Sequence, residues 1–147
     1  MVRSIIAVLL GIILAFVVLF ALEGIGMLVY PLPEGVSPND TEALKKLLPN
    51  MPVGAFLLVL LGNAVGSLAG GFLGAWMARR AQATHALIVG TVLMLMGVAN
   101  LLILPGHPAW FWAASLLVYL PPAYLGARMA LRPPDAPQVQ AAESLVA

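Results

Sequence analysis

The fold is decided by residues 4–30, which read SIIAVLLGIILAFVVLFALEGIGMLVY. A helix needs about 20 apolar residues to cross the hydrocarbon core of a bilayer. This run is long enough to do so, and its one charged residue is Glu23. We therefore predict that residues 4–30 form a membrane-spanning helix.

Three further apolar blocks follow at residues 51–78, 86–104 and 109–127. Each lies within or above the range of about 17–25 residues that a spanning helix requires. The last two blocks are joined by Leu104-Pro105-Gly106-His107-Pro108, a linker that is too short for anything but a tight turn. The predicted fold class is therefore an all-α membrane protein, an antiparallel bundle of four transmembrane helices.

Composition supports this class. The chain is 62% hydrophobic and only 9% charged, whereas a soluble domain carries about 25% charged residues. Its near-neutral balance of seven Lys/Arg against six Asp/Glu argues against a nucleic-acid partner. The chain has no cysteine, so disulfides and thiolate metal sites are excluded.

The basic residues predict an orientation, because cytoplasmic loops carry an excess of Lys and Arg. In the predicted topology, only Lys45 and Lys46 lie on one side of the membrane. We therefore expect both termini to be cytoplasmic and the protein to lie in the plasma membrane, which is the inner membrane in a bacterium. The basic residues on the predicted cytoplasmic side are Arg3, Arg79, Arg80, Arg128 and Arg132.

Proline divides the C-terminal part of the chain. Pro121-Pro122 lies inside the fourth block and should kink it. Beyond Arg132 the sequence is rich in proline and polar residues. We therefore predict a transmembrane domain over residues 1–132 and a flexible cytoplasmic tail over residues 133–147.

The first outer loop contains a helix signal. Ser37 precedes Pro38, which suits a first helical position, and Asp40 follows three residues after Ser37. We predict a short amphipathic helix over Pro38–Leu48, lying on the outer membrane surface or over the bundle. A capped loop helix without amphipathic function is an equally good interpretation.

Glycines recur at every fourth position in the second block. At 3.6 residues per turn they lie along one slowly rotating face. Lipid tails give helices no hydrophobic reason to associate, so close backbone approach must supply the attraction. The pattern predicts a helix–helix contact, either within the monomer or with another chain. The predicted packing residues are Gly62, Gly66, Gly70 and Gly74.

Polar side chains inside the predicted spans fall at similar depths in the outer half of the bilayer. Glu23 precedes the interfacial Tyr30 by seven residues, which places it about 10 Å below the outer interface at 1.5 Å per residue. An intramembrane carboxylate is costly and usually faces the bundle interior or a wet cavity. The predicted polar cluster consists of Glu23, Asn63, Ser67, Asn100 and Ser115.

Two interpretations of Glu23 remain open. It could bind a proton or cation in a transport path, with Asn63 and Asn100 as ligands or relays. It could instead be a structural residue that ties the first helix to the third. His85 and His107 are predicted on opposite membrane faces, so they cannot share a metal site. We predict no catalytic, cofactor-binding or metal-binding residues.

The leading functional hypothesis is a small integral membrane protein that acts by helix packing and catalyses no reaction. It would be a homo-oligomer or an accessory subunit of a membrane complex. Its partners would be the lipid bilayer and, through the second span, itself or another membrane protein. The alternative is a small oligomeric proton-coupled transporter or channel that uses Glu23.

Overall fold

A computed structural model describes residues 2–78 and 80–130, of which 83% are helical and none belongs to a strand. Three helices are long and apolar enough to cross a membrane: α1 (Val2–Val29), α3 (Val53–Ala78) and α4 (Gln82–Ile103). The all-α class is thereby confirmed, and the three long apolar helices are consistent with a membrane protein. The predicted tail, residues 133–147, lies outside the described residues, as do Arg79 and Arg132.

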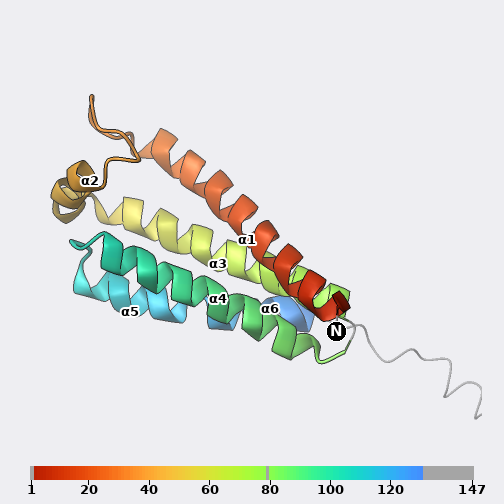
Figure 1. The fold of residues 1–147 in the computed structure, drawn as a ribbon. Coiled ribbons are helices and arrows are strands. Elements are labelled where there is room, and N and C mark those ends of the chain that lie inside the picture. The colour runs from red at the N-terminus through yellow and green to blue at the C-terminus, as the bar shows by residue number, and fades with distance from the viewer. Residues whose placement is uncertain (1, 79, 131–147) are drawn as a thin grey trace, which may run out of the picture.

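The predicted fourth block is two short helices, α5 (Ala109–Leu117) and α6 (Leu120–Ala130). Figure 1 shows them following one another alongside α4. The helix is interrupted at residues 118–119, and Pro121-Pro122 lies in the first turn of α6. Because proline has no backbone N–H to donate, two carbonyl groups of the preceding turn lose their helical partners. The expected kink is therefore a break between two helices.

The long helices differ slightly from the predicted blocks. The largest shift is at the start of α4, which begins at Gln82 rather than at residue 86. Residues 82–85, three of which are polar, form the first turn of the helix, and His85 contacts the carbonyl oxygen of Ala81 through its Nδ1 atom at 2.9 Å. Hydropathy marks the apolar part of a helix, so it misses a polar first turn.

The loop between α1 and α3 contains a shorter helix than predicted, α2 (Thr41–Leu47), followed by the 3₁₀ turn η1 (Leu48–Asn50). The prediction that the helix begins at Pro38 is wrong. The Ser37 hydroxyl instead accepts a hydrogen bond from the backbone N–H of Asn39 at 3.3 Å, within a turn. The helix is capped by Asp40, whose carboxylate accepts a hydrogen bond from the backbone N–H of Ala43 at 3.0 Å.

The end of this loop packs onto the bundle. Leu48 is buried in a cluster with Phe56 of α3, Leu101 of α4 and Phe111 of α5. In Figure 1, α2 lies across one end of the long helices. Apolar side chains of the loop therefore cover the end of the bundle at which α1 finishes and α3 begins.

The most extensive helix contact joins α1 and α3, which run antiparallel (Figure 1). All four predicted packing glycines are buried, and they face a row of residues on α1 with the same four-residue spacing. The row on α1 is composed mainly of small side chains, which permit close backbone approach. The facing pairs are Ala7 with Gly74, Gly11 with Gly70, Ala15 with Gly66, and Leu19 with Gly62. We call these four pairs the glycine ladder.

A second close contact joins α3 to α6. A Cβ added to Gly71 would collide with the backbone of Ala123, at 2.7 Å from its Cα atom. A Cβ added to Gly126 would collide with Leu68 and lie 2.7 Å from the backbone nitrogen of Phe72. Helix α3 therefore packs closely on two sides, with α1 against the glycine ladder and α6 against the other face.

Candidate functional site

Helices α1 and α3 separate where the glycine ladder ends. Gly62 is its last glycine, and the next residue on that face of α3 is Leu58, against which Gly26 of α1 lies. A leucine holds two helix backbones farther apart than a glycine does. In Figure 1, α1 leans away from α3 towards the end that carries α2. Glu23 lies in α1 just beyond the ladder.

A polar cavity of about 130 Å³, which we call the polar chamber, fills the space between the separating helices. It is lined by residues of α1, α3, α4 and α5 and by Tyr119 between α5 and α6. All members of the predicted polar cluster line it, so the structure brings together side chains that are far apart in the sequence. These residues are Glu23, Asn63, Ser67, Asn100 and Ser115.

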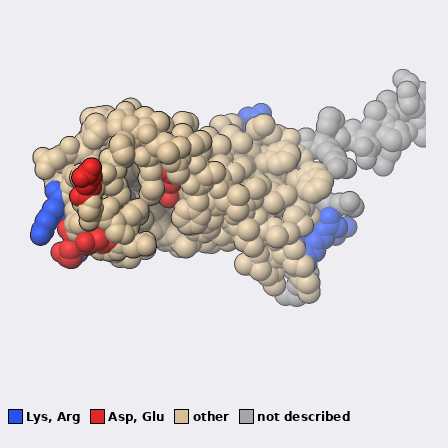
Figure 2. Space-filling view, turned by 90° about the horizontal axis from the view of Figure 1, so that it is seen from above, with Lys and Arg blue, Asp and Glu red and all other residues tan. Residues whose placement is uncertain are grey.

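The five polar residues differ in exposure. Ser67 and Ser115 are buried, at 0% and 4% exposure, and lie at the deep end of the chamber. Glu23 and Asn63 are half-buried, whereas Asn100 is exposed. The chamber therefore reaches the surface beside α4. Figure 2 shows a hollowed surface in this half of the molecule, towards the end with the lysines.

Ser67 has no hydrogen-bond partner among the described residues, although its Oγ atom is fully buried. Leaving a buried hydroxyl without a partner costs about 1–3 kcal/mol. Such groups are rare in native proteins. A polar solute in the chamber would give this hydroxyl the partner that it lacks.

Sequence reasoning missed Tyr119, which is buried and lines the polar chamber. Its hydroxyl packs directly against Gly97 of α4, where a Cβ would collide with it. A signal was present, because Phe111, Ser115 and Tyr119 are spaced by four residues, as on one face of a helix. The glycine at position 97 gives the tyrosine ring the room to reach this position.

His107 also lines the polar chamber, although we predicted it only as a residue of the outer turn. Its Nδ1 atom donates a hydrogen bond to the carbonyl oxygen of Leu104 at 2.8 Å. Its ring stacks on that of Phe111, with centroids 5.0 Å apart and planes inclined by 11°. Burial lowers the pKa of His107, and the hydrogen bond to Leu104 partly offsets this effect. The neutral imidazole is therefore favoured, with Nε2 as a free acceptor.

The electrostatics of the chamber depend on one residue. Glu23 is the only acidic residue among the described residues that line it, and none of them is a lysine or an arginine. Within the described part of the chain, no three His, Cys, Asp or Glu side chains are placed to hold a metal ion together. The site is thus a single carboxylate among neutral hydrogen-bonding groups and apolar side chains.

A second cavity, the apolar chamber, adjoins the first and has a volume of about 240 Å³. It lies between the C-terminal end of α1 and the N-terminal end of α3, under the loop that contains α2. Leu44 and Leu48 form part of its roof, and Tyr30 and Phe56 are among its aromatic residues. Glu23 lines this chamber as well, so the carboxylate stands at the boundary between the two.

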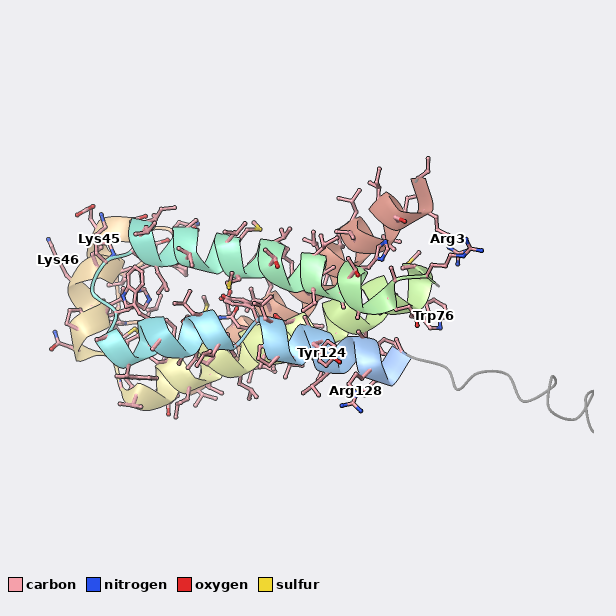
Figure 3. The ribbon with its side chains drawn as sticks, turned by 90° about the horizontal axis from the view of Figure 1, so that it is seen from below. Arg3, Lys45, Lys46, Trp76, Tyr124 and Arg128 are labelled. Carbon is pink, nitrogen blue, oxygen red and sulfur yellow. The ribbon has the colours of Figure 1, made fainter. Side chains whose placement is uncertain are left out.

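Charged side chains gather at the two ends of the molecule (Figure 2). Figure 3 shows Lys45 and Lys46 at the end with α2, and Arg3 and Arg128 towards the opposite end, near the aromatic rings of Trp76 and Tyr124. The polar chamber lies in the half of the bundle nearer the lysines. No family of known sequences, curated protein or solved structure matches this chain.

Proposed function

We propose that the chain is a plasma-membrane protein of four crossings that binds a proton or small cation at Glu23 in a transport path. The observation that carries this proposal is the polar chamber, in which one carboxylate from α1 meets neutral polar groups from three other helices. Buried charges in proteins are normally paired, and carboxylates within a membrane usually serve a proton or ion pathway. In the described part of the chain, no cationic side chain lines the chamber to pair with Glu23.

In this proposal α5 and α6 together make the fourth crossing. Residues 109–130 would extend over roughly 33 Å at 1.5 Å per residue, enough for a hydrocarbon core of about 30 Å. The break between α5 and α6 lies against the bundle, because the side chain of Tyr119 is buried there. The turn between α4 and α5 returns the chain to the side on which α4 began.

The basic residues support cytoplasmic termini. Arg3, Arg80 and Arg128 belong to the end opposite Lys45 and Lys46. The end with more basic residues is expected to be cytoplasmic. The polar chamber then lies in the outer half of the membrane, and α2 acts as an amphipathic cover over the outer end of the bundle, with Leu44 facing the apolar chamber.

The chamber supports transport better than a role in helix packing. The packing hypothesis depended on the glycine row of α3, but in the monomer α1 already occupies that row. The row therefore offers no free groove to a partner. The chamber, by contrast, reaches the surface and contains an unpartnered hydroxyl, that of Ser67.

The test is proton flux in vesicles reconstituted with the purified protein, followed with a pH-sensitive dye inside. We expect a pH gradient to decay faster than in empty vesicles. Glu23→Gln should abolish this acceleration, because the amide cannot release a proton or pair with a cation. The matched control is Glu34→Gln, which neutralises an exposed acid of the outer loop. Flux of Glu23→Gln equal to that of the parent protein would contradict the proposal.

A second candidate function is an interaction protein, which is favoured by the thin coverage of α1. Only 17% of the most apolar stretch of α1 is buried, against 33% in α3 and 28% in α4. A partner helix would therefore pack on the outer face of α1, which includes the exposed Val17. Native mass spectrometry from mild detergent would then show a complex that Val17→Trp dissociates. A monomer at all concentrations would exclude a homo-oligomer.

A further inference from the structure

The two chambers share a wall, and the properties of its two sides differ. Four residues line both cavities: Glu23, Val59, His107 and Phe111. On one side of this wall are the amides of Asn63 and Asn100 and the unpartnered Ser67 hydroxyl. On the other side, apart from residues of the shared wall, the lining is leucine, methionine and other apolar or aromatic side chains. The paired cavities are therefore amphiphilic.

The apolar chamber is large enough for an organic group. Its volume is about 240 Å³, and a cavity of about 150 Å³ in another protein holds a benzene molecule. Moving apolar surface out of water is favourable by about 25 cal/mol of free energy per Å². A ligand with an apolar body therefore gains binding free energy in this chamber, whereas a bare ion or a proton gains none there.

The charge at the shared wall restricts the head group of such a ligand. A carboxylate without a cationic neighbour repels anions, and a neutral head group leaves it unpaired. A divalent metal ion needs several carboxylate or carbonyl ligands, and the described residues offer no group of three ionisable ligands. An ammonium group suits the site, because it pairs with one carboxylate and donates to neutral oxygens such as those of Asn63 and Ser67.

We infer that the ligand class is an amphiphilic organic ammonium ion. Its ammonium head binds Glu23 in the polar chamber, and its hydrocarbon body occupies the apolar chamber. Phe111 and Tyr119 line the polar chamber, and aromatic rings within about 6 Å attract such cations. This inference rests on the proposed cation binding at Glu23 and adds the requirement for an apolar body.

The test is calorimetric titration of the protein in lipid nanodiscs, with empty nanodiscs subtracted to remove partitioning into lipid. The probes are hexylammonium, methylammonium and hexanol. We expect hexylammonium to bind at least tenfold more tightly than either methylammonium or hexanol, because only hexylammonium uses both chambers. Glu23→Gln should remove the preference for hexylammonium over hexanol and leave hexanol binding unchanged.

Two glycines of α1 offer a matched pair of variants for the apolar chamber. Gly26 lines it, and a Cβ there would make ordinary contact with Leu58 at 3.9 Å. Gly24 does not line it, and nothing lies within 4 Å of an added Cβ. Gly26→Leu should lower hexylammonium affinity to that of methylammonium, and Gly24→Leu should not. Met51→Trp fills the same chamber from the loop before α3 and should act as Gly26→Leu does.

The binding of methylammonium distinguishes the possible results. This binding should survive in Gly26→Leu, which also shows that this variant is folded. Equal affinities for hexylammonium and methylammonium in the parent protein would overturn the inference, while loss of proton flux in Glu23→Gln would still support the proposed transport site. Glu23-dependent hexylammonium binding without flux would support the ligand class and overturn the transport proposal. Equal losses in Gly24→Leu and Gly26→Leu would overturn the placement of the hydrocarbon body.

Discussion

Gly11 of α1 and Gly70 of α3 lie against each other so closely that neither position has room for a side chain. A Cβ on Gly70 would lie 2.5 Å from the carbonyl oxygen of Gly11, and a Cβ on Gly11 would lie 2.7 Å from the carbonyl oxygen of Gly70. Real Cβ atoms essentially never make contacts this short. The crossing of the two helices at this pair is therefore possible only with glycine on both sides.

We expect Gly70→Ala to destabilise the protein by about 1–3 kcal/mol, the usual cost of overpacking. The added methyl group meets backbone, which cannot move aside without separating the helices. Thermal unfolding in detergent measures the effect, and Gly24→Ala, in open space, is the control. Gly62→Ala should have a smaller effect, since its nearest neighbour at 3.3 Å is the flexible end of Leu19. Equal stabilities of the Gly70 and Gly24 variants would refute this ranking.

Ser67→Ala should raise the free energy of unfolding by about 1 kcal/mol, because it removes a buried hydroxyl that has no partner. The same thermal measurement applies. A clear loss of stability would mean that the hydroxyl is hydrogen-bonded to solvent in the chamber. The substitution should also weaken methylammonium binding, since one donor–acceptor group leaves the polar chamber.

His107 should make the protein less stable in mild acid. Burial lowers its pKa in the folded protein below the ordinary value of 6.5, so the unfolded chain binds the proton more readily. Stability is therefore unaffected above that value and falls as the pH drops through it towards the lowered pKa. Unfolding midpoints measured between neutral pH and about pH 5 would detect this loss of stability. In His107→Phe, which keeps a ring to stack on Phe111, the fall should be smaller.

Asp40→Ala should lower the stability of helix α2 by about 1 kcal/mol, the typical contribution of an N-terminal cap. The lost contact is the hydrogen bond from the backbone N–H of Ala43 to the carboxylate, at 3.0 Å. Faster hydrogen exchange of the backbone amides of residues 41–47 would show that this hydrogen bond is lost. Asn39→Ala, one residue earlier and also exposed, is the control and should leave the exchange of α2 unchanged.

The long helices were predictable because the requirement for about 20 apolar residues leaves little choice of structure. Their ends were less predictable, as the polar first turn of α4 shows. The break between α5 and α6 follows from Pro121-Pro122, but a proline pair by itself does not distinguish a kink from an interruption. The predicted helix start at Pro38 was wrong because a serine before a proline also suits a turn.

The polar chamber was partly predictable, because depth along a helix can be counted from its interfacial residues. That count placed Glu23 and Asn100 at nearby depths, and both line the chamber. The count could not predict that His107 lines the chamber, because the position of His107 depends on the turn at Gly106, where φ is +123°. Nor could it predict the row of small residues on α1, because Gly11 and Ala15 are common in any apolar segment.

The walls of the polar chamber come from both ends of the chain, with Glu23 in the first helix and Ser115 just after the start of the last pair. During synthesis, α1, α3 and α4 are complete before Ser115 and Tyr119 have been added. In the proposed four-crossing topology one wall is missing until then, and the carboxylate has acyl chains where it will later have a protein neighbour. Insertion of α5 and α6 would then seal the interior, and a chain that stops short of them would leave Glu23 unsheltered in the lipid.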